Sequence, residues 1–257
     1  MKNYVISLNT AIERRKHITH EFGKQDITFE FFDAITTHQL DEVSKQLGLL
    51  LFESRRLSAI EKACFLSHIS LWQKMIDNNL EYIAIFEDDI YLGKNAKSFL
   101  TDYQWLSNNL NDTDIVKLET AFEETHLNKE VTGYENRYFS RLQSSHTGAA
   151  AYIISNKAAS TLLQYIRALN VDDYIAIDHI IFGKLLSELH VYQMTPALSI
   201  QSTVLEGDNP TLKSDLEIER SKHKKIAPKG SRDLNHFFKK IKRSISKRIF
   251  YTTVLFE

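Results

Sequence analysis

Residues 81–93 read Glu-Tyr-Ile-Ala-Ile-Phe-Glu-Asp-Asp-Ile-Tyr-Leu-Gly, and this stretch decides the fold. The uncharged run from Tyr82 to Phe86 is typical of a strand inside a sheet with both faces covered. Three carboxylates, Glu87-Asp88-Asp89, follow it and need a counter-charge if they are buried, because desolvation is costly for each ion. A divalent cation is the simplest counter-charge, and ligands of open α/β sheets bind beyond the carboxyl ends of strands. The stretch therefore predicts a metal and phosphate-ester site for nucleotide chemistry; the alternative is a solvent-facing acidic turn.

Strand-like and helix-like segments alternate around this stretch. We expect strands at residues 4–8, 29–32, 82–86, 114–118, 137–142, 149–154 and 191–194. We expect helices at residues 12–23, 58–78, 96–110 and 155–169, and another from about residue 178. Strands separated by helices of this length predict an α/β fold with a mainly parallel sheet flanked by helices. The polar segment from Glu119 to Tyr134 is predicted to be a long loop.

The composition is that of an ordinary globular protein. The 257 residues are 43% hydrophobic and 25% charged, which allows one large α/β domain with an appendage. A single cysteine, Cys64, excludes an intramolecular disulfide framework and favours a reducing compartment. The first residues lack the apolar core of a signal peptide, and no stretch approaches 18 apolar residues. We therefore expect a cytoplasmic protein.

The charge is strongly segregated along the chain. Residues 220–257 carry twelve Lys or Arg against two acids, whereas the rest carries twenty against thirty-one. We expect a catalytic domain at 1–218 and a basic tail at 219–257. Apolar residues of the tail follow a helical stripe: Leu234, Phe237, Phe238, Ile241, Ile245 and Ile249. Basic residues fill most of the other positions: Lys239, Lys240, Lys242, Arg243, Lys247 and Arg248.

This pattern predicts an amphipathic helix that lies on an anionic membrane surface. The alternative is docking of the stripe on the protein's own acidic body or on a second subunit. Nucleic acid is not an expected partner, because the apolar stripe would have no use there.

The end of the first strand offers candidate nucleotide contacts. Ser7 and Asn9 end the strand, and Arg14 and Arg15 follow in the same βα connection. An amide can bind a base or ribose, and a guanidinium can bind a phosphate. The alternative for both arginines is that they are solvated residues in the first turn of a surface helix.

The long helix carries a second group of candidates. Helical spacing places Cys64, His68 and Trp72 near one face, with Ser67 beside it. His68 and Ser67 are candidate donors to a phosphate or to a carboxylate of the acidic run; the alternative for His68 is a satisfied core residue. Cys64 and His68 within one helix do not form the usual geometry of a thiol protease.

Three further residues are candidates because of their neighbours. Lys117 interrupts an apolar strand, so it either reaches the metal and diphosphate or lies at a sheet edge. Thr147 lies in a run of small residues that allows a ligand to approach the backbone closely. Asp178 begins a helix and is either a plain N-cap or a base that faces the cleft.

The acidic run itself suggests a division of roles. In an extended backbone Glu87 and Asp89 share one side and Asp88 faces the other. Asp89 is expected to ligate the metal directly, with Glu87 as a second ligand. Glu87 and Asp88 are also candidates for contacts to the donor's ribose or to a bound water.

Taken together, these pieces resemble glycosyltransferase family 25, the bacterial lipooligosaccharide galactosyltransferases that are related to the procollagen galactosyltransferases. The resemblance covers about residues 1–205, and the pieces that carry it are 4–8 with Arg14-Arg15, 63–68 with Leu71-Trp72, 85–89, 116–118, 147–148 with 151–155, and 171–178.

The resemblance implies a GT-A (Rossmann-like) fold, a UDP-sugar donor and inversion at the sugar carbon. It also implies a manganese ion on the acidic motif, with magnesium as the alternative. We expect transfer of galactose from UDP-galactose to a lipid-linked oligosaccharide of lipooligosaccharide, at the inner face of the cytoplasmic membrane. UDP-glucose is the alternative donor. The base is expected to be Asp178, with Asp172 and Asp173 as alternatives. A metal-dependent phosphohydrolase is a rival that would need more ligands than the acidic run offers.

Overall fold

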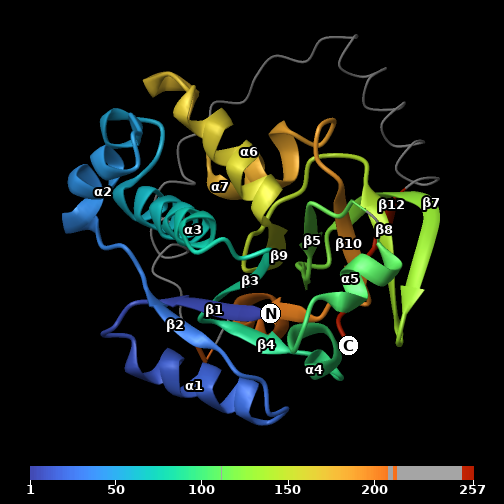
Figure 1. Cartoon of the computed structure of the whole chain (residues 1–257). Coiled ribbons are helices and arrows are strands. Elements are labelled where there is room, and N and C mark those ends of the chain that lie inside the picture. The colour runs from blue at the N-terminus through green and yellow to red at the C-terminus, as the bar shows by residue number, and fades with distance from the viewer. Residues whose placement is uncertain (111, 208–210, 213–250) are drawn as a thin grey trace, which may run out of the picture.

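A nine-stranded sheet forms the centre of the computed structural model, which describes residues 1–110, 112–207, 211–212 and 251–257 (Figure 1). Its strand order is β12-β7-β8-β10-β5-β9-β3-β1-β2. The strands are β1 (Lys2–Ser7), β2 (Glu30–Asp33), β3 (Tyr82–Glu87), β5 (Ile115–Lys117), β7 (Glu124–Tyr134), β8 (Arg137–Leu142), β9 (Ala151–Ser155), β10 (Val191–Thr195) and β12 (Tyr251–Thr253).

The sheet is mixed. Strands β2, β1, β3, β5, β10 and β7 point in one direction, and β9, β8 and β12 point in the other. The α/β class and the predominance of one strand direction agree with the prediction. The antiparallel insertion of β9 between β3 and β5 was not predicted, because an apolar run does not reveal strand direction.

A small second sheet lies beside the carboxyl end of β3, in the order β4-β11-β6. Its strands are β4 (Ile90–Leu92), β6 (Glu119–Thr120) and β11 (Ser199–Gln201). The helices are α1 (Ile12–Gly23), α2 (Leu40–Gln46), α3 (Ala59–Asp77), α4 (Ala96–Leu100), α5 (Gln104–Asn109), α6 (Asn156–Arg167), α7 (Ile177–His179) and α8 (Ser202–Glu206). The main chain passes directly from α7 into a wider helical turn at Ile180–Lys184.

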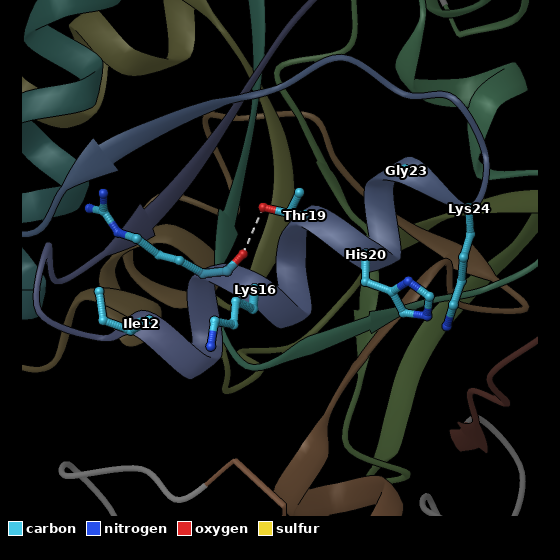
Figure 2. A pocket seen from close by; sticks show the side chains of 7 residues that line it. Ile12, Lys16, Thr19, His20, Gly23 and Lys24 are labelled. Atoms are coloured by element: carbon cyan, nitrogen blue, oxygen red, sulfur yellow. Dashed lines mark hydrogen bonds between the residues drawn. The ribbon is translucent and has the colours of Figure 1, made fainter.

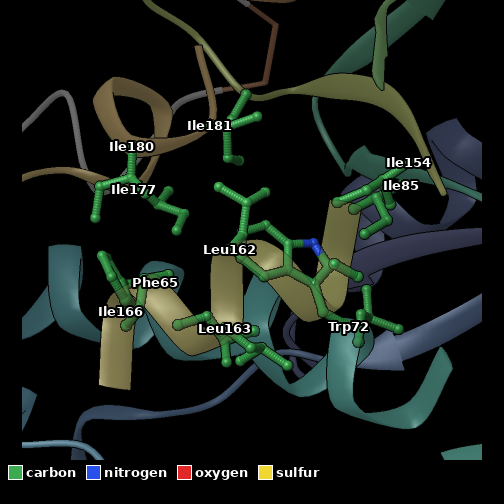
Figure 3. Close-up of a cluster of buried hydrophobic side chains, with 14 of the residues drawn as sticks. Phe65, Trp72, Ile85, Ile154, Leu162, Leu163, Ile166, Ile177, Ile180 and Ile181 are labelled. Atoms are coloured by element: carbon green, nitrogen blue, oxygen red, sulfur yellow. The ribbon is translucent and has the colours of Figure 1, made fainter. Parts of the chain in front are cut away.

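Two hydrophobic cores cover the two faces of the main sheet. Ile83 and Ile85 of β3 join the core beneath α3 and α6, whereas Ala84 and Phe86 join the core on the side of α1 and α4. Side chains alternate between the faces of a strand, so these two assignments place the cores on opposite faces. The helices lie on both sides of the sheet in Figure 1, and Figure 3 shows side chains of α3 and α6 packed together with Ile85 and Ile154. Burial on both faces explains why the sequence of β3 is continuously apolar.

Two helix starts form as their sequences predict. The hydroxyl of Ser58 accepts a hydrogen bond from the Glu61 N–H at 3.2 Å, and the Glu61 carboxylate accepts one from the Ser58 N–H at 3.0 Å. This capping box opens α3. The Ser155 hydroxyl caps α6 in the same way by accepting a bond from the Ala158 N–H.

Two predicted elements are wrong. The single helix expected at 96–110 is two helices, α4 and α5, because the Asp102 carboxylate binds the Gln104 N–H and starts a new turn. The loop expected between Glu119 and Tyr134 contains β6 and β7 instead. Many side chains of β7 are exposed or half-buried, so the strand lacks the apolar alternation that would have identified it.

The last residues of the chain belong to the body. Strand β12 pairs with β7, and the Val254 carbonyl accepts a hydrogen bond from the Thr120 hydroxyl at 2.6 Å. The buried Arg137 guanidinium donates to the main-chain oxygen of Glu257 at 2.6 Å. The part of the predicted 219–257 tail from Tyr251 onward is therefore a strand of the main sheet and the residues that follow it. The predicted boundary at 218 and the amphipathic stripe lie outside the described residues.

In the described ranges, no helix combines the length and apolar character that crossing a membrane requires.

Candidate functional site

A cavity of about 380 Å³ opens at the carboxyl ends of β1 and β3. Its walls come from the β1–α1 connection, the segment after β2, one face of α3, and the acidic run. Seven of the predicted site residues line it: Ser7, Arg14, Ser67, His68, Glu87, Asp88 and Asp89. The cavity therefore lies where the sequence predicted a site, beyond the ends of parallel strands. The contribution of residues 34–37 was not predicted, because no charged or repeated motif marks that segment.

Asp88 is turned away from its two acidic neighbours. Its Oδ2 accepts a hydrogen bond from the Ser7 hydroxyl at 2.6 Å, and its Oδ1 forms an ion pair with Arg14 at 2.6 Å. Only 8% of the Asp88 side chain is exposed, and 22% of the Arg14 side chain is. Asp88 thus ties the acidic run to β1 and α1, and its two oxygens are both occupied by protein donors.

Glu87 and Asp89 face a common partner, the side-chain amide of Gln201 at the end of β11. The Gln201 Nε2 lies 3.1 Å from Glu87 Oε2 and 3.2 Å from Asp89 Oδ1. The prediction that residues 87 and 89 share a side while residue 88 faces the other is confirmed. Gln201 itself was missed, because nothing in a three-residue strand more than a hundred positions away indicates that it meets the acidic run.

Asp89 is an unusual carboxyl group. It is 2% exposed, and burial raises its pKa to about 7, with a further increase from the Glu87 carboxylate; Arg14 acts in the opposite direction. Arg14 and the neutral Gln201 amide do not offset the effects of burial and of the neighbouring carboxylates, so the pKa stays raised, and a cation bound here would favour the ionised form.

The donor set fits a hard divalent cation. Carboxylate oxygens are the ligands that Mg²⁺ and Mn²⁺ prefer, and oxygens of Glu87 and Asp89 already converge on one amide nitrogen. Glu87 and Asp89 would hold such an ion, while Asp88 orients the run from outside.

A second group of side chains lies on the α3 side of the cavity. The ligand atoms of Cys64, His68 and Glu87 lie within 4.8 Å of one another. His68 is fully buried, and its Nδ1 lies 2.9 Å from the Tyr152 hydroxyl, which also accepts a hydrogen bond from the Trp72 indole N–H at 3.0 Å. His68 is thus buried in the core and also lines the cavity, but its ring is not fully satisfied, because Nε2 lacks a hydrogen-bond partner among the described residues. Its expected function as a donor to a phosphate or to a carboxylate stays a prediction.

Ser67 and Asn9 differ from the prediction in different ways. The Ser67 hydroxyl donates to the Ala63 carbonyl at 2.8 Å and accepts from the Ile35 N–H at 2.9 Å, so it joins α3 to the segment after β2. Asn9 is exposed in the turn before α1 and is not part of the cavity wall.

Lys117 does not reach the cavity. Its ammonium donates to Glu119 Oε1 at 2.9 Å and to the carbonyls of Thr147 and Gly148 at 2.8 and 2.5 Å. All three donors of the buried ammonium are therefore used inside the protein. Burial raises the pKa of Glu119, and the ion pair with Lys117 opposes this increase. The function of Lys117 seen in the structure is to hold the 147–148 loop against Glu119.

Thr147 and Asp178 lie at this same loop. The Thr147 hydroxyl donates to Glu123 Oε2 at 2.9 Å. The Gly148 N–H donates to Asp178 Oδ2 at 3.0 Å, and two residues later the Ala150 carbonyl accepts a hydrogen bond from the Glu87 N–H at 2.8 Å. One short loop therefore holds both Asp178 and the first residue of the acidic run, although Asp178 and Thr147 do not line the cavity.

The two alternative base residues, Asp172 and Asp173, lie elsewhere on the surface. Both are exposed; the main-chain oxygen of Asp172 binds Arg56, and the Asp173 carboxylate binds Asn170.

A larger hollow of about 730 Å³ lies along the outer side of α1, where Figure 2 shows Lys16, His20 and Lys24 on successive turns. Arg15 lines it, but its guanidinium is bound to the Ser7 and Leu8 carbonyls and to Asp33. No carboxylate lines this hollow, so it lacks the chemistry of the smaller cavity.

Comparison with known proteins assigns the chain to one family of enzymes. Residues 1–181 match the family described as glycosyltransferase family 25 (LPS biosynthesis protein). The lacto-N-neotetraose biosynthesis glycosyltransferase LgtE of Neisseria meningitidis serogroup B is 39% identical over 234 residues, which cover 88% of this chain and 84% of that protein. The lipooligosaccharide biosynthesis protein lex-1 of Haemophilus influenzae is 35% identical over 278 residues, covering 97% of this chain and 91% of that protein.

Among solved structures, a glycosyltransferase involved in the glycosylation of the major capsid of PBCV-1 aligns over 86% of this chain and 97% of that one. The TM-score is 0.44 at 8% sequence identity.

Proposed function

Because the chain belongs to glycosyltransferase family 25, we propose that it is an inverting, metal-dependent hexosyltransferase with a GT-A type of fold. The donor is UDP-galactose, and the acceptor is a saccharide hydroxyl of a growing lipooligosaccharide. The observation that carries this proposal is the convergence of Glu87 and Asp89 on one point, next to a cavity at the carboxyl end of β3. The family resemblance supports galactose, and the names of the relatives in the family support the lipooligosaccharide acceptor.

We expect different residues of the cavity to bind different parts of the donor. Glu87 and Asp89 would hold the divalent ion, manganese or magnesium. Arg14, held by Asp88, places a positive charge in the cavity wall beside the diphosphate. When bound, the ion would neutralise negative charge that develops on the leaving diphosphate.

The reaction is a single displacement at the anomeric carbon. A carboxylate takes the proton from the acceptor hydroxyl, the acceptor oxygen attacks the anomeric carbon, and UDP leaves. Asp178 is the proposed base, because the loop that holds it by Gly148 also holds Glu87 by Ala150. This connection keeps Asp178 on the same side of the sheet end as the acidic run, whereas Asp172 and Asp173 are not tied to it.

The rival donor and the rival reaction class are separated by one experiment. The purified protein is incubated with UDP-galactose or UDP-glucose, with a lipooligosaccharide acceptor, in manganese or in EDTA. We expect galactose transfer in manganese and none in EDTA. Glucose transfer instead would change the donor, and release of UMP and sugar 1-phosphate without sugar transfer would support a phosphohydrolase.

The assignment of the base is tested separately. Asp178→Asn should lower kcat by orders of magnitude while UDP binds normally, and Asp173→Asn is the matched control because its carboxylate is exposed and its binding partner, Asn170, lies beside it on the surface. An unchanged kcat in Asp178→Asn would assign the base to another residue.

A lipid-linked acceptor would explain why the chain carries a basic tail. An enzyme that glycosylates a lipid-linked acceptor from the cytoplasm benefits from a basic segment that binds the anionic inner face of the membrane. The composition of residues 219–250 supports this part of the proposal.

A further inference from the structure

The hydrogen bonds around Tyr152 determine where the proton of His68 lies. The Tyr152 hydroxyl has two neighbours in hydrogen-bond range within the described ranges, the Trp72 Nε1 at 3.0 Å and the His68 Nδ1 at 2.9 Å. An indole N–H can only donate, so the Tyr152 oxygen accepts from Trp72. The Tyr152 proton then has one acceptor in reach, the His68 Nδ1. Tyr152 is fully buried, and a buried hydroxyl proton without an acceptor is costly.

This arrangement leaves the His68 proton on Nε2. A neutral imidazole that accepts at Nδ1 donates at Nε2, whereas protonation of Nδ1 would deprive the Tyr152 hydroxyl of its acceptor. Trp72 is itself fixed in the core between α3 and α6, as Figure 3 shows. The orientation of the imidazole is therefore set by two side chains that do not line the cavity.

Among the residues that the structure describes, none forms a hydrogen bond with the His68 Nε2–H. The Nε2 atom is buried and unpaired, and its nearest carboxylate oxygen, Glu87 Oε1, lies 3.8 Å away. His68 lines the cavity, so a ligand oxygen bound there can complete the hydrogen bond. A fixed, desolvated N–H beside a proposed diphosphate site favours a negatively charged oxygen as its partner.

We propose that Trp72 and Tyr152 are positioning residues that fix His68 with its proton on Nε2, and that this N–H binds an anionic oxygen of the nucleotide sugar. The identity of the ligand rests on the proposed function, whereas the position of the proton does not. Neither Trp72 nor Tyr152 contacts the ligand; both act through the imidazole.

The first experiment uses the protein alone. Nitrogen-15 NMR of the histidine side chains reports which ring nitrogen carries the proton. We expect the proton of His68 on Nε2, with Nδ1 accepting a hydrogen bond. A proton on Nδ1 would overturn the proposal.

The same sample separates this proposal from a metal site, since Cys64, His68 and Glu87 could also hold a soft cation. On addition of Zn²⁺ the proton on Nε2 should remain. Its loss, together with the formation of a cysteine thiolate–metal bond, would assign His68 as a ligand instead and would contradict the proposal.

The second experiment measures UDP affinity by calorimetry in manganese. His68→Leu should weaken UDP binding by about tenfold or more, because a hydrogen bond to a charged group is lost. His68→Gln, which keeps a side-chain N–H at a similar reach, should retain more affinity than His68→Leu.

Tyr152→Phe should weaken UDP binding in the wild-type background but have no further effect in the His68→Leu background. Tyr174→Phe is the matched control, because its hydroxyl is bound to the Leu50 N–H in the same core. Equal effects of Tyr152→Phe in both backgrounds would show that Tyr152 does not act through His68. If the tautomer is as expected but UDP does not bind the wild-type protein, the proposed function fails and the positioning of His68 stands.

Discussion

Asp89→Asn should make the metal-free protein more stable at alkaline pH while removing its activity. In the folded protein the pKa of Asp89 is raised to about 7 from an ordinary value of 3.8, mainly by burial. Between pH 3.8 and pH 7, therefore, Asp89 is still protonated in the folded state but already ionised in the unfolded state. Stability is unaffected by this group below pH 3.8, falls as the pH rises, and reaches its full loss above pH 7.

The size of this loss follows from the shift. A shift of about three pH units corresponds to at most about 4 kcal/mol, at about 1.4 kcal/mol per unit. Asn has nearly the same shape, carries no charge, and can still accept the Gln201 amide hydrogen bond. The variant should therefore not lose this free energy of unfolding. In a domain of this size, its Tm at pH 8 should exceed that of the metal-free wild type by roughly 10 °C.

Thermal melts of both proteins in EDTA, between pH 5 and pH 8.5, measure this difference. The wild-type Tm should fall relative to that of Asp89→Asn as the pH rises through 7. When manganese replaces EDTA at a hundredfold excess over its Kd, the free energy of unfolding of the wild type should increase by about 2.7 kcal/mol, so its Tm at pH 8 should rise. The Tm of the variant should not change. A variant that is less stable than the wild type at pH 8 in EDTA would show that the buried Asp89 carboxylate does not destabilise the metal-free protein.

Three further outcomes are expected. Arg14→Ala should weaken UDP binding and destabilise the fold by about 1–3 kcal/mol, because the buried Asp88 carboxylate loses its ion pair and keeps only the Ser7 hydrogen bond. The exposed control Lys16→Ala should change neither the UDP affinity measured by calorimetry nor the stability measured in thermal melts. Lys117→Met should destabilise the protein by about 3–5 kcal/mol in denaturant titrations, because it leaves the buried Glu119 carboxylate without its ion pair. Adding Glu119→Gln should recover part of this stability, and no recovery would contradict a buried ion pair. Charge reversal in the basic tail should release the full-length protein from anionic vesicles in a sedimentation assay, and it leaves β12 in place. The residues to reverse are Lys239, Lys240, Lys242 and Arg243. Unchanged sedimentation would reject the proposed membrane binding.

The site could be predicted from the sequence wherever one strand and its end carry the information. The apolar run before Glu87 fixes a buried strand, and the alternation of an extended chain separates Asp88 from its two neighbours. Capping residues such as Ser58 and Ser155 identify helix starts because their partners are only three residues away.

The contacts that the sequence did not reveal are those made across the fold. Gln201 meets the acidic run because β11 pairs with β4, and no local pattern encodes that pairing. Lys117 was expected either to reach the metal and diphosphate or to lie at a sheet edge. Its ammonium instead binds the nearby Glu119 and, across the fold, the main-chain oxygens of the 147–148 loop. The role of Tyr152 also depends on a long-range contact, since it meets Trp72 and His68 only when β9 is inserted beside β3.

We propose that Glu87 and Asp89 hold a divalent ion against the diphosphate of a nucleotide sugar. A crystal structure with UDP and manganese, with an anomalous difference map recorded for manganese, is the sharpest test of this proposal. We expect one strong peak in contact with an oxygen of Glu87, an oxygen of Asp89 and the diphosphate. A peak on Cys64 and His68, or UDP bound in the cavity with no metal beside Asp89, would contradict it.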